Sequence, residues 1–319
     1  MTNRAFELEI IRFFQRAASP SATVLAKIIS GLGSAPAYII AILFIYWIID
    51  EKKGIKLALL LAFSWALNEF LKALLAQPRP FIIDPGVMIV YENGFSTPSG
   101  HAQTAAAFWL GIAVIFGFRK TPAILAAALI GLSRVYLGVH YPGDVILGWI
   151  IGGCLAALLL VPKYMRKLRL FAKVPQSYAA RITNLADRGS IKILLFALAA
   201  YILNGKKFVN AAAPGIFFGC GCAFVFAPRF NAAKGSTLKK FLRCVIGYAA
   251  LIACAVAAAR FPIKLFANHT RLLQFAVGAF AALWALAITP AFFKALGLAD
   301  AYPKRAVCGE SSKEDAKNA

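Results

Sequence analysis

The chain of 319 residues is 61% hydrophobic and only 15% charged, with a mean hydropathy of +0.72. Soluble domains carry about 25% charged residues, so this composition excludes a water-soluble globule and predicts an all-α bundle of membrane helices. The formal net charge of +22 does not indicate nucleic-acid binding, because the basic residues alternate between loops of the expected bundle instead of covering one soluble face.

Residues 1–20 predict an amphipathic helix that lies in the membrane interface. Phe6, Ile10 and Phe13 recur at helical spacing on one face, whereas Glu9 and Arg12 fall on the opposite face. A helix with this pattern rests along the boundary between lipid head groups and acyl chains rather than crossing the bilayer.

Apolar runs recur along the rest of the chain. A bilayer core takes about 20 mostly apolar residues per helix, and the runs of this kind predict about nine membrane-spanning helices. Uncharged runs cover residues 28–49, 100–118, 145–162, 208–228, 244–259 and 272–293, and runs that carry charge near an end or are shorter cover 57–76, 121–135 and 193–205.

Basic residues concentrate in alternate loops, around Lys52, around Arg119, and within 163–188 and 229–243. The positive-inside rule places these loops in the cytoplasm, and the N-terminus and the loops at 77–99 and 134–144 on the other side. After the helix of residues 1–20, we expect a membrane domain at 21–165, a basic cytoplasmic linker at 166–190, a membrane region of four helices at 191–300 and a disordered tail at 301–319.

The first polar cluster is the stretch KALLAQPRP, from Lys72 to Pro80. On a continuous helix Lys72 and Arg79 would share a face, since they are two turns apart. Pro78 and Pro80 predict instead that the helix ends and that Arg79 lies in the loop just beyond. Taken alone, the stretch also fits a snorkelling lysine beside a juxtamembrane arginine.

The second cluster lies in the stretch STPSGHAQT. Ser99, Gly100 and His101 fall where an extracytoplasmic loop becomes a membrane helix. The free N–H groups at a helix start form an anion site, and Gly100 permits a close approach to the backbone. The alternative is ordinary capping of the helix by Ser99.

The third cluster lies in the stretch LSRVYLGVHYPGD. Arg134 ends one apolar run, and His140 and Asp144 precede the next. If the turn after His140 is helical, the Asp144 carboxylate faces the imidazole, fixes one tautomer and leaves the other ring nitrogen as a nucleophile or base. The alternative is an interfacial cap in which Asp144 favours the helix start and His140 is merely hydrated.

Topology places all three clusters at one membrane face. Three cations close together repel one another, and charge near a membrane core is costly. A multiply charged anion balances them, since a cation–anion contact at about 4 Å is worth on the order of 4 kcal/mol at an effective dielectric near 20. Phosphate is the obvious candidate.

The three clusters, taken in order, resemble the signature of the type-2 phosphatidic acid phosphatase superfamily, which includes membrane lipid phosphatases, glucose-6-phosphatases and vanadium-dependent haloperoxidases. The resemblance covers roughly residues 20–162 and leaves the second half unexplained. It implies that 21–165 is a catalytic domain in which His140 is the nucleophile, Asp144 orients it and His101 is the general acid and base. It also implies a set of phosphate-binding residues: Lys72, Arg79, Ser99, Gly100 and Arg134.

The resemblance implies a lipid phosphatase that forms a phosphohistidine, and the positive-inside topology puts its site on the non-cytoplasmic side, so we expect a bacterial inner-membrane protein with a periplasmic site. Undecaprenyl diphosphate, phosphatidylglycerol phosphate, phosphatidate and lipid A phosphate all fit as substrates. The expected partners are the phosphorylated lipid substrate and other membrane lipids, with no nucleic acid, and dimerisation or partner binding through the second half stays open. No acidic cluster is available to hold a metal at this face, so we expect no cofactor. A lipid phosphotransferase and a soluble sugar-phosphate phosphatase remain alternatives, as does a transporter that uses the cations only to bind phospholipid or another anion.

Overall fold

The computed structural model describes residues 2–159, 211–227, 230–260 and 270–300, and the regular structure in these ranges is helical throughout, which confirms the all-α class. Two helices contain or end in π-helical turns, at Ile45–Ile49 and Trp284–Ile288, and Pro85–Val87 forms one 3₁₀ turn. The helices are α1 (Thr2–Gln15), α2 (Pro20–Leu32), α3 (Ala35–Phe44), α4 (Glu51–Leu75), α5 (Pro80–Ile83), α6 (Gly100–Phe116), α7 (Lys120–Tyr136), α8 (Pro142–Leu158), α12 (Ala212–Phe226), α13 (Thr237–Arg260), α14 (Thr270–Leu283) and α15 (Thr289–Ala295).

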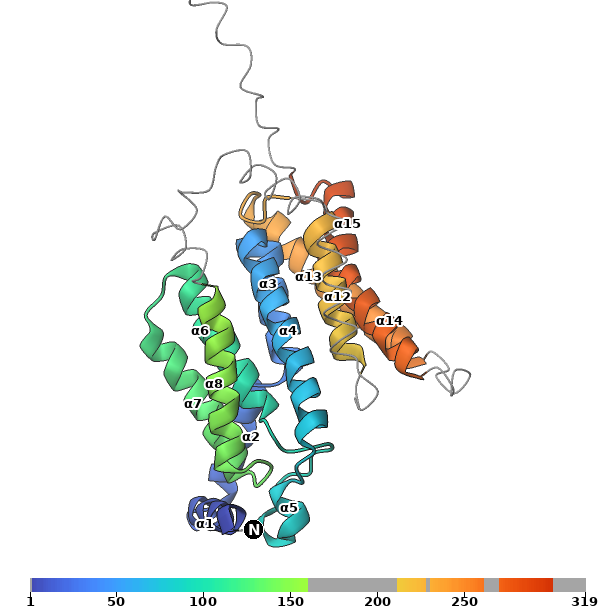
Figure 1. The fold of residues 1–319 in the computed structure, drawn as a ribbon. Coiled ribbons are helices and arrows are strands. Elements are labelled where there is room, and N and C mark those ends of the chain that lie inside the picture. The colour runs from blue at the N-terminus through green and yellow to red at the C-terminus, as the bar shows by residue number, and fades with distance from the viewer. Residues whose placement is uncertain (1, 160–210, 228–229, 261–269, 301–319) are drawn as a thin grey trace, which may run out of the picture.

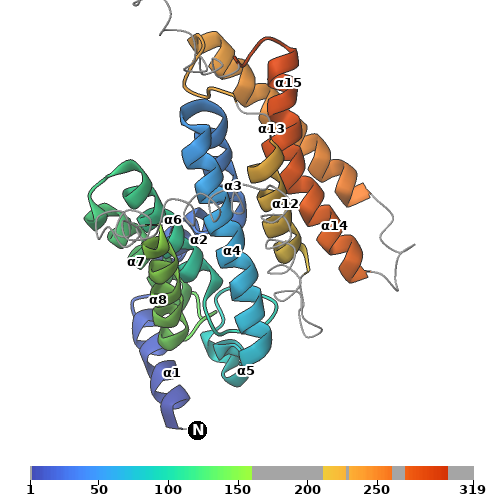
Figure 2. The ribbon, with the colours of Figure 1, turned by 45° about the horizontal axis from the view of Figure 1, so that its top comes forward.

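Helices α3 and α4 run through the middle of the molecule (Figures 1 and 2). Helices α6, α7 and α8 pack together on one side of them, and α12 to α15 pack on the other, with α4 in contact with both α6 and α12. Helices α1 and α5 lie together at one end. The core between these groups is built from apolar side chains of α3, α4, α6 and α12.

The apolar run predicted at 28–49 is two helices and not one straight span. Helix α2 begins at Pro20, where the Ser19 hydroxyl accepts a hydrogen bond from the Ala22 amide at 3.1 Å, and it ends at Leu32. Helix α3 restarts at Ala35, and the pair is bent by 48°. The break falls where Gly33 ends one helix and Ser34 and Pro36 begin the next, a sequence of residues typical of helix ends.

The helix that carries Lys72 ends as the prolines predict. Helix α4 stops at Leu75, Ala76 adopts a left-handed conformation at φ 46°, and Arg79 is the residue before α5. Lys72 and Arg79 are therefore on different elements at the same end of the bundle. The chain turns before Pro78, because a residue that precedes a proline is disfavoured in the helical region.

Two close helix contacts bring the second and third polar clusters together. A Cβ at Gly148 would lie 2.8 Å from the Ser99 carbonyl oxygen, and one at Gly152 would lie 2.2 Å from that of Gln103. Only glycine permits this approach of α8 to α6. As a result the Ser99 amide donates a hydrogen bond to the Asp144 carbonyl at 3.0 Å, which joins the starts of α6 and α8.

By length and composition, two helical segments of the described residues can cross a membrane, Glu51–Ile83 and Arg271–Ala295, and a third qualifies if α2 and α3 form one bent span. Helices α6, α8 and α12 are apolar but shorter; a helix of 17 residues, such as α6 or α8, rises about 26 Å. The count of about nine spans therefore stays a prediction. The predicted run 193–205, the linker 166–190 and the tail 301–319 lie outside the described residues.

Candidate functional site

Arg79 and His140 meet at the centre of the predicted site. One guanidinium nitrogen of Arg79, Nη1, lies 3.3 Å from His140 Nε2 and donates a hydrogen bond to the Val139 carbonyl at 3.0 Å. Further bonds from Arg79 reach the carbonyls of Gly94 and Asn93 at 3.0 and 2.9 Å. The loop between α5 and α6 thus holds the Arg79 side chain with one edge of the guanidinium against the imidazole.

The His140 ring has a defined orientation. Its Nδ1 faces Asp144 Oδ2 at 3.6 Å, a distance longer than that of a direct hydrogen bond. Because arginine can only donate, Nε2 accepts from Arg79, and the network places the imidazole proton on Nδ1. The predicted pairing of His140 with Asp144 is present, and the nitrogen that carries the lone pair points away from the carboxylate.

Burial lowers the pKa of His140 well below its ordinary value of 6.5, and the nearby cations Lys72, Arg79 and Arg134 lower it further, while Asp144 opposes them. The unfolded chain therefore takes up a proton below about pH 6.5 that the folded chain does not, so folding stability is lost as the pH falls below 6.5. We expect His140 to contribute up to about 1.4 kcal/mol of this loss per pH unit. The measurement is thermal unfolding in detergent between pH 7.5 and 5.5, where His140→Gln should lose less stability than the original chain. An equal loss in both proteins would contradict the expectation.

The Asp144 carboxylate is held from several directions. It accepts a hydrogen bond from the Tyr141 amide at 3.1 Å, which caps α8, and bonds from the hydroxyls of Ser96 and Thr97. Arg4 of helix α1 contributes an ion pair at 3.5 Å. The carboxylate is therefore fixed beside His140 by its own helix, by the loop before α6 and by the N-terminal helix.

Glu92 bridges the two arginines of the predicted phosphate site. One of its carboxylate oxygens accepts from Arg79 at 3.1 Å and the other pairs with Arg134. Arg134 also donates to the Ser30 hydroxyl, while its Nε has no partner among the described residues. Both arginines are almost fully buried, so a carboxylate balances their charge where the sequence predicts a phosphate.

The remaining predicted residues lie around the same space. Lys72, Gly100 and His101 line one cavity together with Glu92. Ser99 caps α6, since its hydroxyl oxygen accepts a hydrogen bond from the Ala102 amide at 3.5 Å. The structure therefore brings all eight predicted residues to one end of the bundle, and it shows the capping role of Ser99 that the sequence left open.

Sequence reasoning missed a group of polar residues that supports this site. Ser96 and Thr97 lie close to the predicted Ser99 in the same stretch, and their hydroxyl groups could have indicated a polar contact there. Asn68 bonds to the Gln103 side chain at 2.9 Å and so fixes α4 against α6; a polar residue four positions before Lys72 in an apolar helix was the corresponding signal. No sequence pattern indicated that Glu92 and Arg4 would contact the site.

Two segments of the chain match known protein families. Residues 53–167 match the PAP2 superfamily, and residues 211–301 match the PAP2 superfamily phosphatase transmembrane extension. This chain belongs to the PAP2 superfamily. The family inferred from the three motifs is confirmed, but the likeness does not stop near residue 162, because the second half also matches an extension of the same family. Together with the apolar helices, this extension identifies an integral membrane protein.

Several PAP2 relatives with described activities are similar to part of the chain. A lipid A 1-phosphatase of Rhizobium etli is 32% identical over 142 residues, which are 43% of this chain and 59% of the relative. An undecaprenyl-diphosphatase of Sulfolobus acidocaldarius is 34% identical over 113 residues, 34% of this chain and 54% of the relative. A phosphatidylglycerophosphatase B of Bacillus subtilis is 33% identical over 129 residues, 37% of this chain and 61% of the relative. The chain thus spans between half and two thirds of the length of these relatives.

Proposed function

We propose that this protein is a membrane lipid phosphatase that removes the terminal phosphate of a lipid monophosphate or diphosphate through a phosphohistidine at His140. The observation that carries the proposal is the orientation of His140, whose unprotonated Nε2 points at the guanidinium of Arg79 while Nδ1 faces Asp144. A site built only to bind an anion has no use for an oriented imidazole lone pair. The relatives, whose names describe phosphatases of lipids, support the same reaction.

In the first step the substrate phosphoryl group displaces the Glu92 carboxylate from between Arg79 and Arg134. The His140 Nε2 lone pair then attacks phosphorus, a P–N bond forms, and the bond between phosphorus and the leaving oxygen breaks. His101, which lines the same cavity, donates the proton that the leaving oxygen needs. The positive charge that develops on the imidazole is stabilised by Asp144.

In the second step water attacks the phosphohistidine. His101, now without its proton, accepts one from the water, the P–N bond breaks, and inorganic phosphate leaves with His140 restored. Throughout both steps the equatorial phosphoryl oxygens accept hydrogen bonds from Lys72, Arg79 and Arg134, as well as from the Ser99 hydroxyl and the Gly100 amide. Fixed donors of this kind need little reorganisation as charge moves in the transition state.

These cations fill the role that a divalent metal fills in other phosphoryl-transfer enzymes. Among the described residues no group of three or more His, Cys, Asp or Glu side chains is arranged to hold a metal. We therefore propose a metal-independent reaction.

The domain boundaries and orientation follow as parts of the same proposal. All eight site residues fall within 21–165, which supports a catalytic domain there, followed by a cytoplasmic linker at 166–190. The site lies at the end of the bundle opposite the basic turns that begin α4 and α7. The positive-inside rule puts those turns in the cytoplasm, and we propose a bacterial inner-membrane protein of about nine spans with a periplasmic site.

A panel assay on the purified full-length protein tests the proposal. It measures release of inorganic phosphate from undecaprenyl diphosphate, phosphatidylglycerol phosphate, phosphatidate and glucose 6-phosphate, each with and without EDTA. We expect release from at least one lipid phosphate at a rate that EDTA does not change. Release from glucose 6-phosphate alone would favour the sugar-phosphate alternative, whereas transfer of the phosphoryl group to an added lipid would identify a phosphotransferase. Loss of activity in EDTA that magnesium restores would refute the metal-independent reaction.

A further inference from the structure

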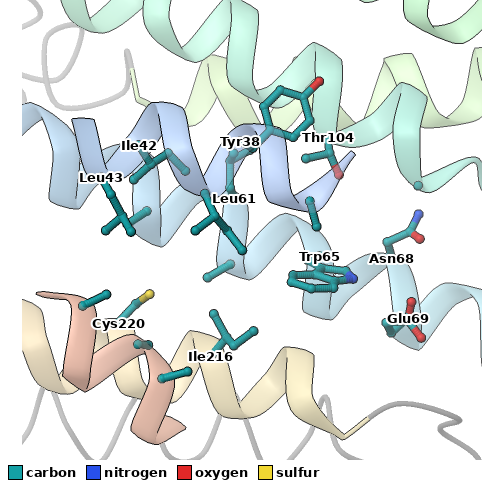
Figure 3. Close-up of a pocket in the computed structure, with 18 of the residues that line it drawn as sticks. Tyr38, Ile42, Leu43, Leu61, Trp65, Asn68, Glu69, Thr104, Ile216 and Cys220 are labelled. Atoms are coloured by element: carbon teal, nitrogen blue, oxygen red, sulfur yellow. The ribbon is translucent and has the colours of Figure 1, made fainter. Parts of the chain in front are cut away.

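A cavity of about 330 Å³ lies between the middle of the bundle and the C-terminal helices. Figure 3 shows side chains of α3 and α4 facing Ile216 and Cys220 of α12 across it. Its volume is at the lower end of the range for ligand pockets. The cavity has one polar end and is otherwise lined by apolar and small side chains.

The polar end of the cavity is the site described above. Lys72, Glu92 and His101 line it there, so the cavity is continuous with the place where the phosphate is proposed to bind. A ligand that occupies both must therefore carry an anionic group at one end only.

The cavity follows one face of helix α4. Its lining residues on this helix recur every three or four positions from Ala58, through Leu61 and Trp65, to Asn68 and Lys72. The distance along the axis between Ala58 and Lys72 is about 21 Å. Polarity changes along it: Asn68 and Glu69 lie toward one end, whereas Leu61, Ile42 and Leu43 lie toward the other (Figure 3).

The C-terminal extension supplies the opposite wall. The residues that face the cavity from it are mostly small or aliphatic: Ile216, Cys220, Leu251, Ala281, Ala282, Ala285 and Leu286. Helices α12 and α14 are in close contact, since a Cβ at Gly215 would lie 2.1 Å from the Phe275 carbonyl oxygen and one at Gly219 would lie 2.4 Å from that of Ala279. Tight packing through glycine and alanine holds this wall in place, and its small side chains leave the space open.

We propose that this cavity binds the hydrocarbon chain of the phosphorylated lipid and that the C-terminal extension selects substrates by that chain. The proposal rests on the proposed function, because it takes the head group to be the phosphate bound at Lys72 and His101. An apolar cavity of this kind stays dry and favours an apolar ligand. Each buried methylene of the chain adds about fourfold in affinity, so the extension would favour long chains over short ones.

Filling the cavity tests this proposal. Ala281 is half-buried in α14 and lines the cavity, whereas Ala276 is exposed on the same helix and does not line it. We expect Ala281→Phe to lower the ratio of kcat/KM for hexadecyl phosphate to that for butyl phosphate by about tenfold or more, since the ring displaces several methylenes. Ala276→Phe, the matched control, should leave the ratio unchanged. Equal ratios in the two variants would overturn the proposal.

A second readout does not depend on turnover. An alkyl phosphate with a diazirine near the end of a sixteen-carbon chain is photolysed on the full-length protein, and the labelled peptides are identified by mass spectrometry. Label within α12 and α14 that hexadecyl phosphate competes away supports the proposal, even if the panel assay finds no phosphate release. Label confined to other helices overturns it, even if phosphate release is found.

Discussion

Replacing His140 with glutamine should abolish phosphate release, with a fall on the order of 10⁴-fold or more, because the covalent route depends on one nitrogen. Glutamine is close in size to histidine and keeps a polar group near Asp144, so the fold should survive in detergent. The measurement is single-turnover labelling with a ³²P-phosphate ester, followed by a test for the acid-labile, base-stable bond typical of phosphohistidine.

The other two histidines provide matched controls. With p-nitrophenyl phosphate, whose leaving group needs no proton, His101→Gln should still form the phosphoenzyme and should accumulate it, because activation of water is lost. His269, which lies outside the described residues, should tolerate the same substitution without effect. Undiminished label in His140→Gln would eliminate the proposed nucleophile, and rapid turnover in His101→Gln would remove His101 from the second step.

The sequence could group the eight proposed site residues, which the structure brings to one end of the bundle, because the relevant residue types are rare in their surroundings. In an apolar chain with 3 histidines, a histidine beside a helix start and an aspartate four residues after another histidine are informative without any structure. Positive-inside topology then placed the three clusters at one face. The sequence also predicted where a helix ends, since Pro78 and Pro80 indicated the end of the helix that carries Lys72.

The partners of these residues could not be predicted in the same way. Glu92 reaches Arg79 and Arg134 from an irregular loop, and Arg4 reaches Asp144 from a position 140 residues earlier in the sequence. Contacts of this kind follow no helical or strand period, so periodicity does not reveal them. They depend on how the chain is packed, which the sequence alone leaves undetermined.

The packing and the cavity of the second half of the chain could not be predicted from the sequence for a related reason. Its alanines and glycines appear in the sequence as a plain apolar background. Only the approach of α12 to α14 shows that Gly215 and Gly219 serve close packing, and only the position of α4 shows that Ala281 faces an open space. A cavity is defined by what neighbouring helices leave unfilled, so no pattern within one segment predicts it.

The Glu92 carboxylate gives the second large expected effect. It occupies the position between two buried arginines that a phosphoryl group would take, so a ligand phosphate must first displace it. Glu92→Gln keeps the shape of the side chain and removes the competing charge. We expect the affinity for inorganic phosphate, and for vanadate as its analogue, to rise by about tenfold to a hundredfold, since a hydrogen bond to a charged group is worth about 1.5–3 kcal/mol.

The same substitution should lower the folding stability of the protein when no phosphate is bound. Without Glu92, Arg79 and Arg134 remain buried with no carboxylate between them, and a buried charge that loses its partner is destabilising. Added phosphate should then raise the melting temperature of Glu92→Gln more than that of the original chain, because a ligand stabilises the folded state according to its affinity. The matched control is Asp84→Asn, which removes a carboxylate of the same loop that pairs with the exposed Arg12.

Thermal unfolding across a phosphate titration separates the possible roles of Glu92. A larger phosphate-induced shift in Glu92→Gln, with Asp84→Asn like the original chain, means that the carboxylate holds the place of the substrate phosphate and keeps the arginines paired when the site is empty. If Glu92→Gln instead binds phosphate less tightly than the original chain, the carboxylate positions Arg79 and Arg134 for the ligand. The first step of the proposed reaction must then proceed without displacement of Glu92. We expect the larger phosphate-induced shift in Glu92→Gln on grounds of charge balance. Arg79 and Arg134 cannot both pair with a phosphate dianion while each of them remains paired with the Glu92 carboxylate.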